Sequence, residues 1–218
     1  KVSQHTLPVK EQEGVIKYEL EHQQMPMTEF FLVKQISAWR AILFRLGLLG
    51  QDPDRYDNLG FGNISHRVKP NSDAFIITGT QTGHIEYLFP EQFVWVDKAE
   101  PKQNRIHSHG LIKPSSEALT HASIYSLDAR VQAVIHVHSP EIWGNTKALN
   151  LPHVAADIPY GTVAMAIAVE QLFKDGSLCN SSVFSMLGHQ DGVVAFGKTI
   201  EEAALELISY LSLSLKSK

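Results

Sequence analysis

Apolar and polar residues alternate along the chain with the two periods expected of helices and strands. Residues 29–50 carry apolar side chains at alternating spacings of four and three, at positions 32, 36, 39, 43 and 46. This spacing predicts an amphipathic helix, and Gly50 is expected to end it. Residues 162–173 predict a mostly buried helix, and residues 199–216 predict another, in which Thr199 and Glu202 have the spacing of a capping box.

Short apolar runs between these helices predict strands. Residues 62–68 and 74–78 flank a loop of hairpin length, and further strands are expected in 93–97, 130–138, 181–187 and 192–197. A helix is expected to start at Pro114, because proline and serine favour a first turn. Helices and strands mix without strict alternation and several connections are short. The pattern therefore favours an α/β fold, a three-layer α/β/α sandwich with a central, largely antiparallel sheet.

Length and composition agree with one globular domain. The chain has 218 residues with 44% hydrophobic residues, enough for a substantial core. Residues 1–28 are interpreted as a polar N-terminal leader or arm, and residues 29–218 as a single domain. No stretch approaches the roughly 18 apolar residues of a membrane span.

The charge and the cysteine count narrow the class of function. The net charge of −4 argues against a nucleic-acid partner or an anionic membrane surface. The single cysteine, Cys179, rules out an internal disulfide framework. It fits a reducing compartment, and we expect a cytoplasmic protein.

The sequence "AVIHVH" places His136 and His138 at the end of a predicted strand. Residues two apart in a strand share a face, so both rings could hold one metal ion. A third ligand must come from elsewhere, and the turn "GHQDG" offers His189 and Asp191. The alternative is a strand end with two hydrogen-bonded histidines, followed by an ordinary Asp-Gly turn.

The sequence "KPSSE" suggests an anion site beside the metal site. Ser115 and Ser116, with the backbone N–H groups of a helix start, could cradle an anion, and Glu117 follows directly. The alternative reading of Glu117 is a helix-start residue favoured by the helix dipole. His121, four residues later, is expected to pack or to support the site.

Together these segments resemble the class II aldolase/adducin family, typified by fuculose-phosphate aldolase and ribulose-phosphate 4-epimerase. The resemblance spans about residues 29–211, and its signals follow the family's order. After the opening helix they are "GNIS" at 62–65, "TGTQTG" at 78–83, "KPSSE" at 113–117, "HVH" at 136–138 and "GHQDGVVAFG" at 188–197.

The resemblance implies roles for particular residues. His136, His138 and His189 would bind a divalent metal, and zinc is the metal expected. Asp191 is the alternate third ligand. Glu117 would transfer the proton. Substrate phosphate would be held by six residues, with Thr78 and Gly79 as a rival match for the middle pair: Gly62, Asn63, Thr82, Gly83, Ser115 and Ser116.

Two features depart from the family pattern. When the chain is aligned on "GVVAFG", Asp191 takes the place of the family's last metal-binding histidine, and His189 lies two residues earlier. The tyrosines that aldolases supply from a neighbouring subunit have no clear counterpart after His153. Groups that close the site would then come from the leader, the C-terminal helix or a neighbouring subunit.

The resemblance implies a metal-dependent aldehyde-lyase of the class II aldolase type. It would cleave or form a C–C bond of a small, phosphorylated sugar or keto acid through a metal-stabilised enediolate. A sugar-phosphate 4-epimerase or a dehydratase on the same site is the first alternative, and a non-catalytic adducin-like scaffold is the second. A homotetramer with its active sites at subunit interfaces is expected.

Overall fold

One nine-stranded sheet runs through the molecule. The computed structural model describes residues 12–217. The strand order across the sheet is β1-β5-β4-β3-β2-β6-β9-β8-β7. The outermost pairs, β1 with β5 and β7 with β8, are parallel, and the inner pairs are antiparallel. The bounds of the strands are β1 Glu19–Gln24, β2 Asn63–Arg67, β3 Phe75–Thr78, β4 Phe93–Glu100, β5 Arg105–Gly110, β6 Ala133–His138, β7 His153–Val154, β8 Val183–Met186 and β9 Gly192–Gly197.

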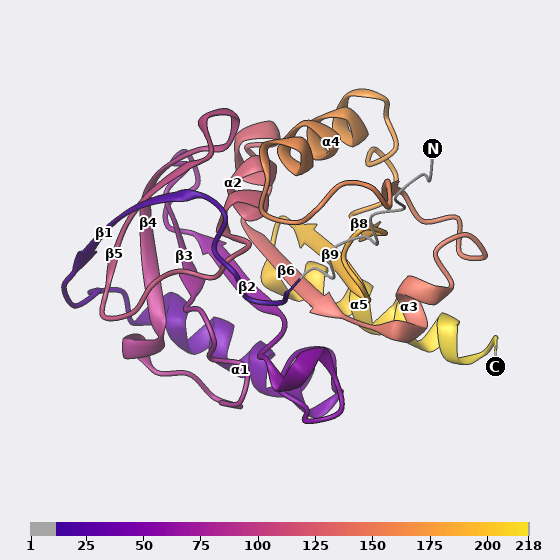
Figure 1. Cartoon of the computed structure of the whole chain (residues 1–218), viewed down its shortest axis with the longest axis horizontal. Helices are drawn as coiled ribbons and strands as arrows, with labels where there is room; N and C mark the ends of the chain where they lie inside the picture. The colour runs from indigo at the N-terminus through magenta and orange to yellow at the C-terminus, as the bar shows by residue number, and fades with distance from the viewer. Residues whose placement is uncertain (1–11, 218) are drawn as a thin grey trace, which may run out of the picture.

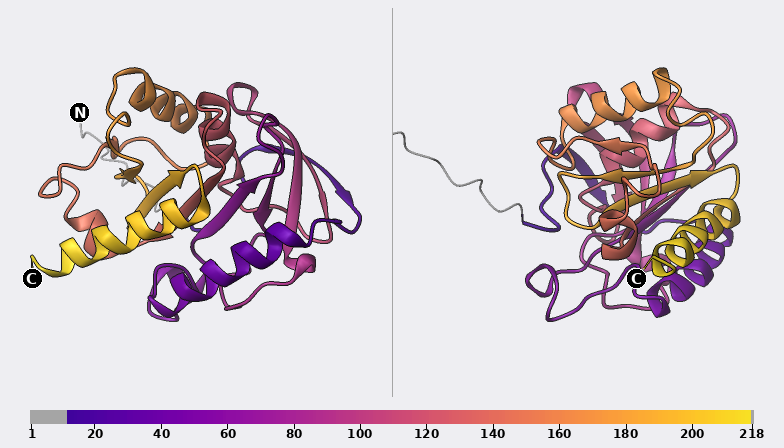
Figure 2. Two further views of the ribbon diagram at one scale, coloured as in Figure 1. Left: turned by 180° about the vertical axis from the view of Figure 1, so that it is seen from behind. Right: turned by 90° about the vertical axis from the view of Figure 1, so that its right-hand side faces the viewer.

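Helices cover both faces of this sheet (Figures 1 and 2). α1 (Phe31–Arg45) and α5 (Ile200–Leu215) lie on one face, and α2 (Ala118–Leu127) and α4 (Val163–Lys174) lie on the other. α3 (Pro140–Gly144) follows β6, and three short 3₁₀ turns span Tyr56–Asn58, Pro90–Gln92 and Pro101–Gln103. Each helix pair closes its own apolar core against the sheet. The predicted three-layer α/β/α sandwich with a largely antiparallel sheet is confirmed; the sheet is mixed because of its two parallel edge pairs.

The sequence pattern located most of these elements and misplaced some ends. The hairpin of β2 and β3 and the pairing of β8 with β9 are as predicted. α1 is shorter than expected: it ends at Arg45, and Gly47, with φ 72°, makes the turn in place of Gly50. α2 begins at Ala118, after the two serines that were expected in its first turn.

The part of the expected leader that the structure describes belongs to the sheet. β1 pairs with β5 over six residues, from Glu19 with Arg105 to Gln24 with Gly110. The hydrophobic pattern did not predict either strand, because β1 alternates only partly and its apolar residues are few. The remainder of the leader, residues 1–11, lies outside the described residues, and the division into leader and domain stays a prediction there.

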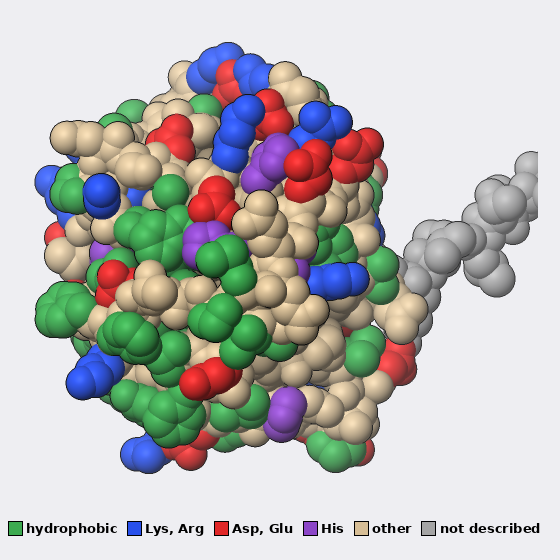
Figure 3. All heavy atoms as spheres, turned by 90° about the vertical axis from the view of Figure 1, so that its left-hand side faces the viewer, with side chains coloured by type: hydrophobic (Ala, Val, Ile, Leu, Met, Phe, Trp, Pro, Cys, Tyr) green, Lys and Arg blue, Asp and Glu red, His purple; other side chains and the backbone are tan. Residues whose placement is uncertain are grey.

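The surface agrees with the composition. Figure 3, which faces the side of β1, shows acidic and basic side chains interspersed, with hydrophobic side chains gathered among them. None of the helices within residues 12–217 has both the length and the apolarity needed to cross a bilayer.

Candidate active site

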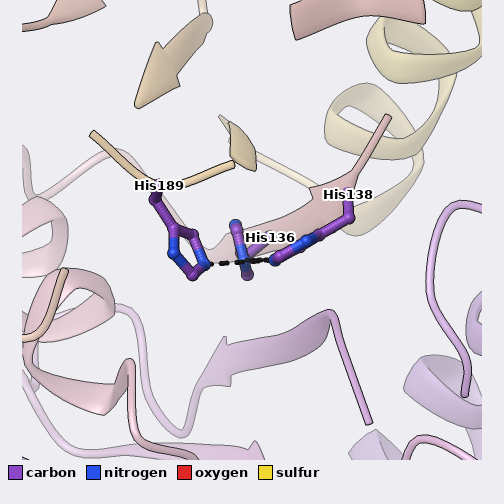
Figure 4. A group of neighbouring side chains, drawn as sticks. All are labelled: His136, His138 and His189. Carbon is purple, nitrogen blue, oxygen red and sulfur yellow. Dashed lines mark hydrogen bonds between the residues drawn. The ribbon is translucent and has the colours of Figure 1, made fainter. Parts of the chain in front are cut away.

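The three histidines expected to bind metal converge at one point. β6 lies in the interior of the sheet between β2 and β9, so the side chains of His136 and His138 are both buried. His189 lies in the turn between β8 and β9 and points to the same place (Figure 4). The Nε2 atom of His138 is 3.1 Å from Nε2 of His136 and 3.1 Å from Nε2 of His189. Three ring nitrogens from two segments therefore face one another in a buried space.

Burial favours the neutral form, which a metal needs, in two of these histidines. Burial lowers the pKa of His189 to about 4, and burial also lowers the pKa of His138 well below its ordinary value. The Nδ1 atom of His136 lies 3.2 Å from the carbonyl oxygen of Val193, so this nitrogen carries the proton and donates it. With a metal bound, Nε2 of His136 would be the ligand atom, while Nδ1–H keeps its hydrogen bond to the carbonyl oxygen of Val193.

Glu117 lies beside this cluster as the N-cap residue of α2. Its side chain is 2% exposed, with Oε2 2.8 Å from His136 Nε2 and Oε1 3.6 Å from His189 Nε2. Burial raises the pKa of this carboxyl, but the His136 and His189 rings and the Asn63 amide lower it by more, so the net shift is downward. Within residues 12–217, Glu117 Oε1 has no hydrogen-bond partner. A buried carboxylate oxygen without a donor is costly unless a cation balances it.

A chain of hydrogen bonds orients Glu117. Asn63 donates from Nδ2 to Glu117 Oε2 at 2.9 Å, and Asn63 Oδ1 lies 2.5 Å from His121 Nε2. His121 Nδ1 lies 2.6 Å from the Ser65 hydroxyl, which in turn lies 2.7 Å from the Tyr125 hydroxyl. Burial lowers the pKa of His121 to about 3, so this ring is neutral. It therefore donates to Asn63 through Nε2–H and accepts from Ser65 at Nδ1.

The donor set fits a divalent metal ion. The buried residues His136, His138 and His189 each offer one ligand atom, and these atoms lie within 4.8 Å of one another. Half-buried Glu13 forms a second group of this kind with the buried residues Glu117 and His189. Neutral imidazole and carboxylate groups suit zinc and its neighbours. The unpartnered oxygen of Glu117 supplies negative charge at the same point.

Asp191 lies elsewhere in the turn. It has φ 65°, and its Oδ2 accepts a hydrogen bond of 2.6 Å from the hydroxyl of Tyr56. Its carboxylate is not in either of the ligand groups formed within residues 12–217. The geometry thus favours His189 over Asp191 as the third metal ligand. The hydrogen bond from Tyr56 explains how Asp191 is held in the turn.

A small polar pocket lies next to the cluster and has a volume of about 20 Å³. All six residues expected to hold phosphate line this pocket. Of the rival pair, Gly79 lines it and Thr78 does not. The Thr78 hydroxyl instead accepts a hydrogen bond from the N–H of Ile64. Close backbone contact requires glycine here: a Cβ on Gly83 would lie 2.3 Å from the carbonyl oxygen of Gly50. Arg40 is fully buried and donates to the carbonyl oxygens of Thr82 and Ile85, which places a positive charge under this loop.

Three residues at the site were missed by the sequence reasoning. Glu13 comes from the N-terminal segment, with its carboxylate 3.7 Å from His138 Nε2 and 3.5 Å from His189 Nε2. The ring of Tyr160 lies 4.6 Å from that of His189, and the ring of Tyr56 lies 4.6 Å from that of His138, measured between centroids. None of the three belongs to a recognisable motif. The only indication of Glu13 was indirect: without the family's tyrosines after His153, groups that close the site were expected from the leader, among other segments.

Comparisons with known proteins agree with this arrangement. Residues 52–213 match the family described as Class II Aldolase and Adducin N-terminal domain. A methylthioribulose-1-phosphate dehydratase of Granulibacter bethesdensis is 32% identical over 107 residues, which cover 49% of this chain and 46% of that protein. The matched part thus spans about half the length of this curated relative.

Solved structures share the fold. YgbL of Escherichia coli, described as a putative aldolase/epimerase/decarboxylase, superimposes with a TM-score of 0.61 at 20% identity, over 84% of this chain and 86% of that one. The L-fuculose-1-phosphate aldolase of Thermus thermophilus superimposes with a TM-score of 0.58 at 22% identity, over 85% of this chain and 91% of that one. With the family match over most of its length, the chain belongs to the class II aldolase and adducin family.

Proposed function

We propose that this protein is a divalent-metal-dependent lyase that acts on a small sugar phosphate or keto acid. One observation carries the proposal: three imidazole nitrogens and the unpartnered, buried oxygen of Glu117 meet beside a polar pocket. A scaffold protein has no need to bury a carboxylate in this way, because the burial costs stability without a compensating cation. The non-catalytic alternative is therefore disfavoured.

His136, His138 and His189 would hold the metal, which we expect to be zinc. When bound, it would act as a Lewis acid that stabilises negative charge on substrate oxygens. Glu117 would move the proton between a substrate carbon and solvent. Its Oε2 is held by Asn63 and its Oε1 is left without a hydrogen-bond donor, so Oε1 is the atom that we assign to proton transfer.

The distal anion of the substrate would bind in the glycine-rich pocket. The hydroxyls of Ser115 and Ser116 and the N–H of Ser116, with the backbone of Gly62 and Gly83, would supply donors, and the buried Arg40 adds positive charge nearby. The N–H of Ser115 already donates to the carbonyl oxygen of Thr78. The side chain of Asn63 is engaged with Glu117, so its part in anion binding would fall to its backbone. The pocket has room for about one water molecule as it stands, so binding a phosphate requires it to widen.

Two reactions fit this site. Cleavage of a C–C bond and elimination of water would both use the Lewis acidity that a metal on the three histidines would supply, together with proton transfer by the Glu117 carboxylate. The dehydratase reaction is kept as the second candidate because the curated relative in G. bethesdensis is a methylthioribulose-1-phosphate dehydratase. A 4-epimerase would use the same groups, but no observation favours it over these two.

A homotetramer with active sites at subunit interfaces remains part of the proposal. Several large apolar side chains are exposed, among them Phe30, Phe31 and Phe89 with 59%, 71% and 60% of their surface accessible. Hydrophobic side chains gather on the face seen in Figure 3. Exposed apolar surface of this kind supports association between subunits. The cytoplasmic location expected from the single cysteine stays a prediction.

The test is a substrate screen with zinc-loaded protein. Ketose 1-phosphates and 2-keto-3-hydroxy acids would be assayed for aldehyde release, and methylthioribulose 1-phosphate for loss of water. We expect turnover of one class that requires metal and is lost in His136→Ala. If the zinc-loaded protein turns over none of these substrates and binds none of them, the catalytic proposal fails.

A further inference from the structure

A charged residue stands in the buried stripe of α1. The buried residues of this helix recur at spacings of three and four, and they include Val33, Ile36, Arg40 and Leu43. Such a stripe is normally apolar, because it packs against a core. Arg40 breaks the pattern, although its exposed fraction is 0%. A buried cation costs stability unless other groups compensate its charge, so its presence here calls for a compensating partner.

The described part of the chain compensates this charge only in part. Arg40 donates from Nε to the carbonyl oxygen of Ile85 at 3.0 Å and from Nη2 to that of Thr82 at 2.7 Å. Its Nη1 atom has no hydrogen-bond partner within residues 12–217. Burial lowers the pKa of Arg40 to about 10, so the group stays charged at neutral pH. Two carbonyl dipoles therefore face a full positive charge.

The contacts of Arg40 lead to the wall of the glycine-rich pocket. Thr82 and Gly83 both line this pocket. The peptide bond between them is trans, so the N–H of Gly83 points away from the carbonyl oxygen that Arg40 binds. This N–H donates to no backbone acceptor within residues 12–217. A cation at the carbonyl end polarises the peptide group, which strengthens the N–H as a donor to a ligand.

The lining of the pocket itself holds no positive charge to attract an anion. Among residues 12–217 no lysine or arginine lines it, and its one charged side chain is the carboxylate of Glu13. A phosphate held there by hydroxyls and backbone N–H groups alone would lie beside a negative charge. Arg40 supplies an opposing charge from behind the wall, one peptide group away.

We propose that Arg40 is a positioning residue that sets the affinity of the glycine-rich pocket for phosphate, and that it acts through the Thr82–Gly83 peptide without touching the ligand. This inference rests on the proposed function, which assigns the distal anion of the substrate to this pocket. It explains why a guanidinium occupies a core position of α1. Its stability cost is offset when an anion binds on the other side of the loop.

The test measures the affinity for inorganic phosphate by titration calorimetry in the zinc-loaded protein. Arg40→Gln keeps one donor but loses the charge, and it should weaken phosphate binding by about 10- to 100-fold, as expected for one charge close to a buried anion. Arg40→Met is a second neutral variant with a different side chain. Arg40→Lys keeps the charge and should bind phosphate within a few-fold of the parent. Each variant is measured at a temperature at which circular dichroism shows it folded.

Ser37→Ala is the matched control. The Ser37 hydroxyl, also on α1, donates to the carbonyl oxygen of Leu88 at 2.7 Å. Its loss removes a neutral contact between α1 and the segment that follows the pocket loop, so phosphate affinity should stay near that of the parent. The series is repeated in His136→Ala/His138→Ala, in which phosphate cannot bind to a metal held by these histidines.

Parent-like phosphate affinity in the folded neutral variants would overturn the inference and leave the pocket in place. An equal loss in Arg40→Lys and Arg40→Gln would also overturn it, because shape and not charge would then matter. If the parent binds no phosphate, the inference fails together with the anion pocket of the proposed function. Zinc binding by the same protein would then show that the metal site stands without them.

Discussion

Asn63 donates a hydrogen bond of 2.9 Å from its amide to Glu117 Oε2, and this bond ties the first residue of β2 to the residue that caps α2. The same asparagine accepts from His121 through Oδ1. His121 therefore orients the Glu117 carboxylate indirectly. It fixes one end of the Asn63 amide, and the other end of that amide holds Glu117.

His121→Phe should break this chain. The substitution leaves Asn63 Oδ1 buried without its partner and leaves Ser65 bonded to Tyr125 alone, so the free energy of unfolding should fall by about 1–3 kcal/mol. Because Glu117 loses its fixed orientation, kcat should fall while KM and zinc content stay near those of the parent. Thr120→Val is the control in the same helix: the Thr120 hydroxyl is buried without a partner in the described chain, so its loss should cost little. A proportional rise in KM with unchanged kcat would argue against a positioning role.

Glu117→Gln keeps the shape of the side chain and removes its ability to take a proton. Turnover should drop by about 10²- to 10⁴-fold while the variant keeps its zinc and its fold. Glu141→Gln provides the comparison, since Glu141 lies in the first turn of α3, outside the ligand groups described for residues 12–217. Near-parent turnover in zinc-loaded Glu117→Gln would show that Glu117 is only a helix-start residue.

His189→Ala and Asp191→Ala should separate clearly in zinc affinity. His189 contributes a ring nitrogen 3.1 Å from that of His138, whereas Asp191 accepts from Tyr56. We therefore expect the larger loss of affinity in His189→Ala, measured by chelator competition. Asp191→Ala should mainly lower stability, because alanine is disfavoured at φ 65°. A larger loss of zinc in Asp191→Ala would reverse the choice of third ligand.

The sequence predicted the layers of the fold and the core of the site because both depend on short periodic patterns. His136 and His138 share a strand face by the period of two, and Thr199 caps α5 by accepting from the N–H of Glu202 as expected. Ser115 and Ser116 line one pocket with the other residues expected to hold phosphate, but they do not lie in α2, which begins only after Glu117. Helix starts are hard to place when several serines and a proline could each cap the first turn.

What could not be predicted depends on contacts between distant segments. Tyr160 donates a hydrogen bond to the carbonyl oxygen of Gln12, which lies 148 positions earlier in the sequence and shortly before β1. Edge pairing in β1 leaves little periodic signal, since most of its side chains are partly or fully exposed. Tyr56 likewise reaches Asp191 from a turn whose three residues all have positive φ. Such backbone geometry has no simple sequence signature for tyrosine or aspartate.

The zinc content of the parent and of the double variant His136→Ala/His138→Ala, measured after equilibrium dialysis, tests the central claim most directly. The two rings point from one strand into the same buried space, so their loss removes half of a tetrahedral ligand set. We predict about one zinc ion per chain for the parent and almost none for the double variant, with both proteins folded. Zinc bound equally by both proteins, or no zinc in the folded parent, would contradict the account.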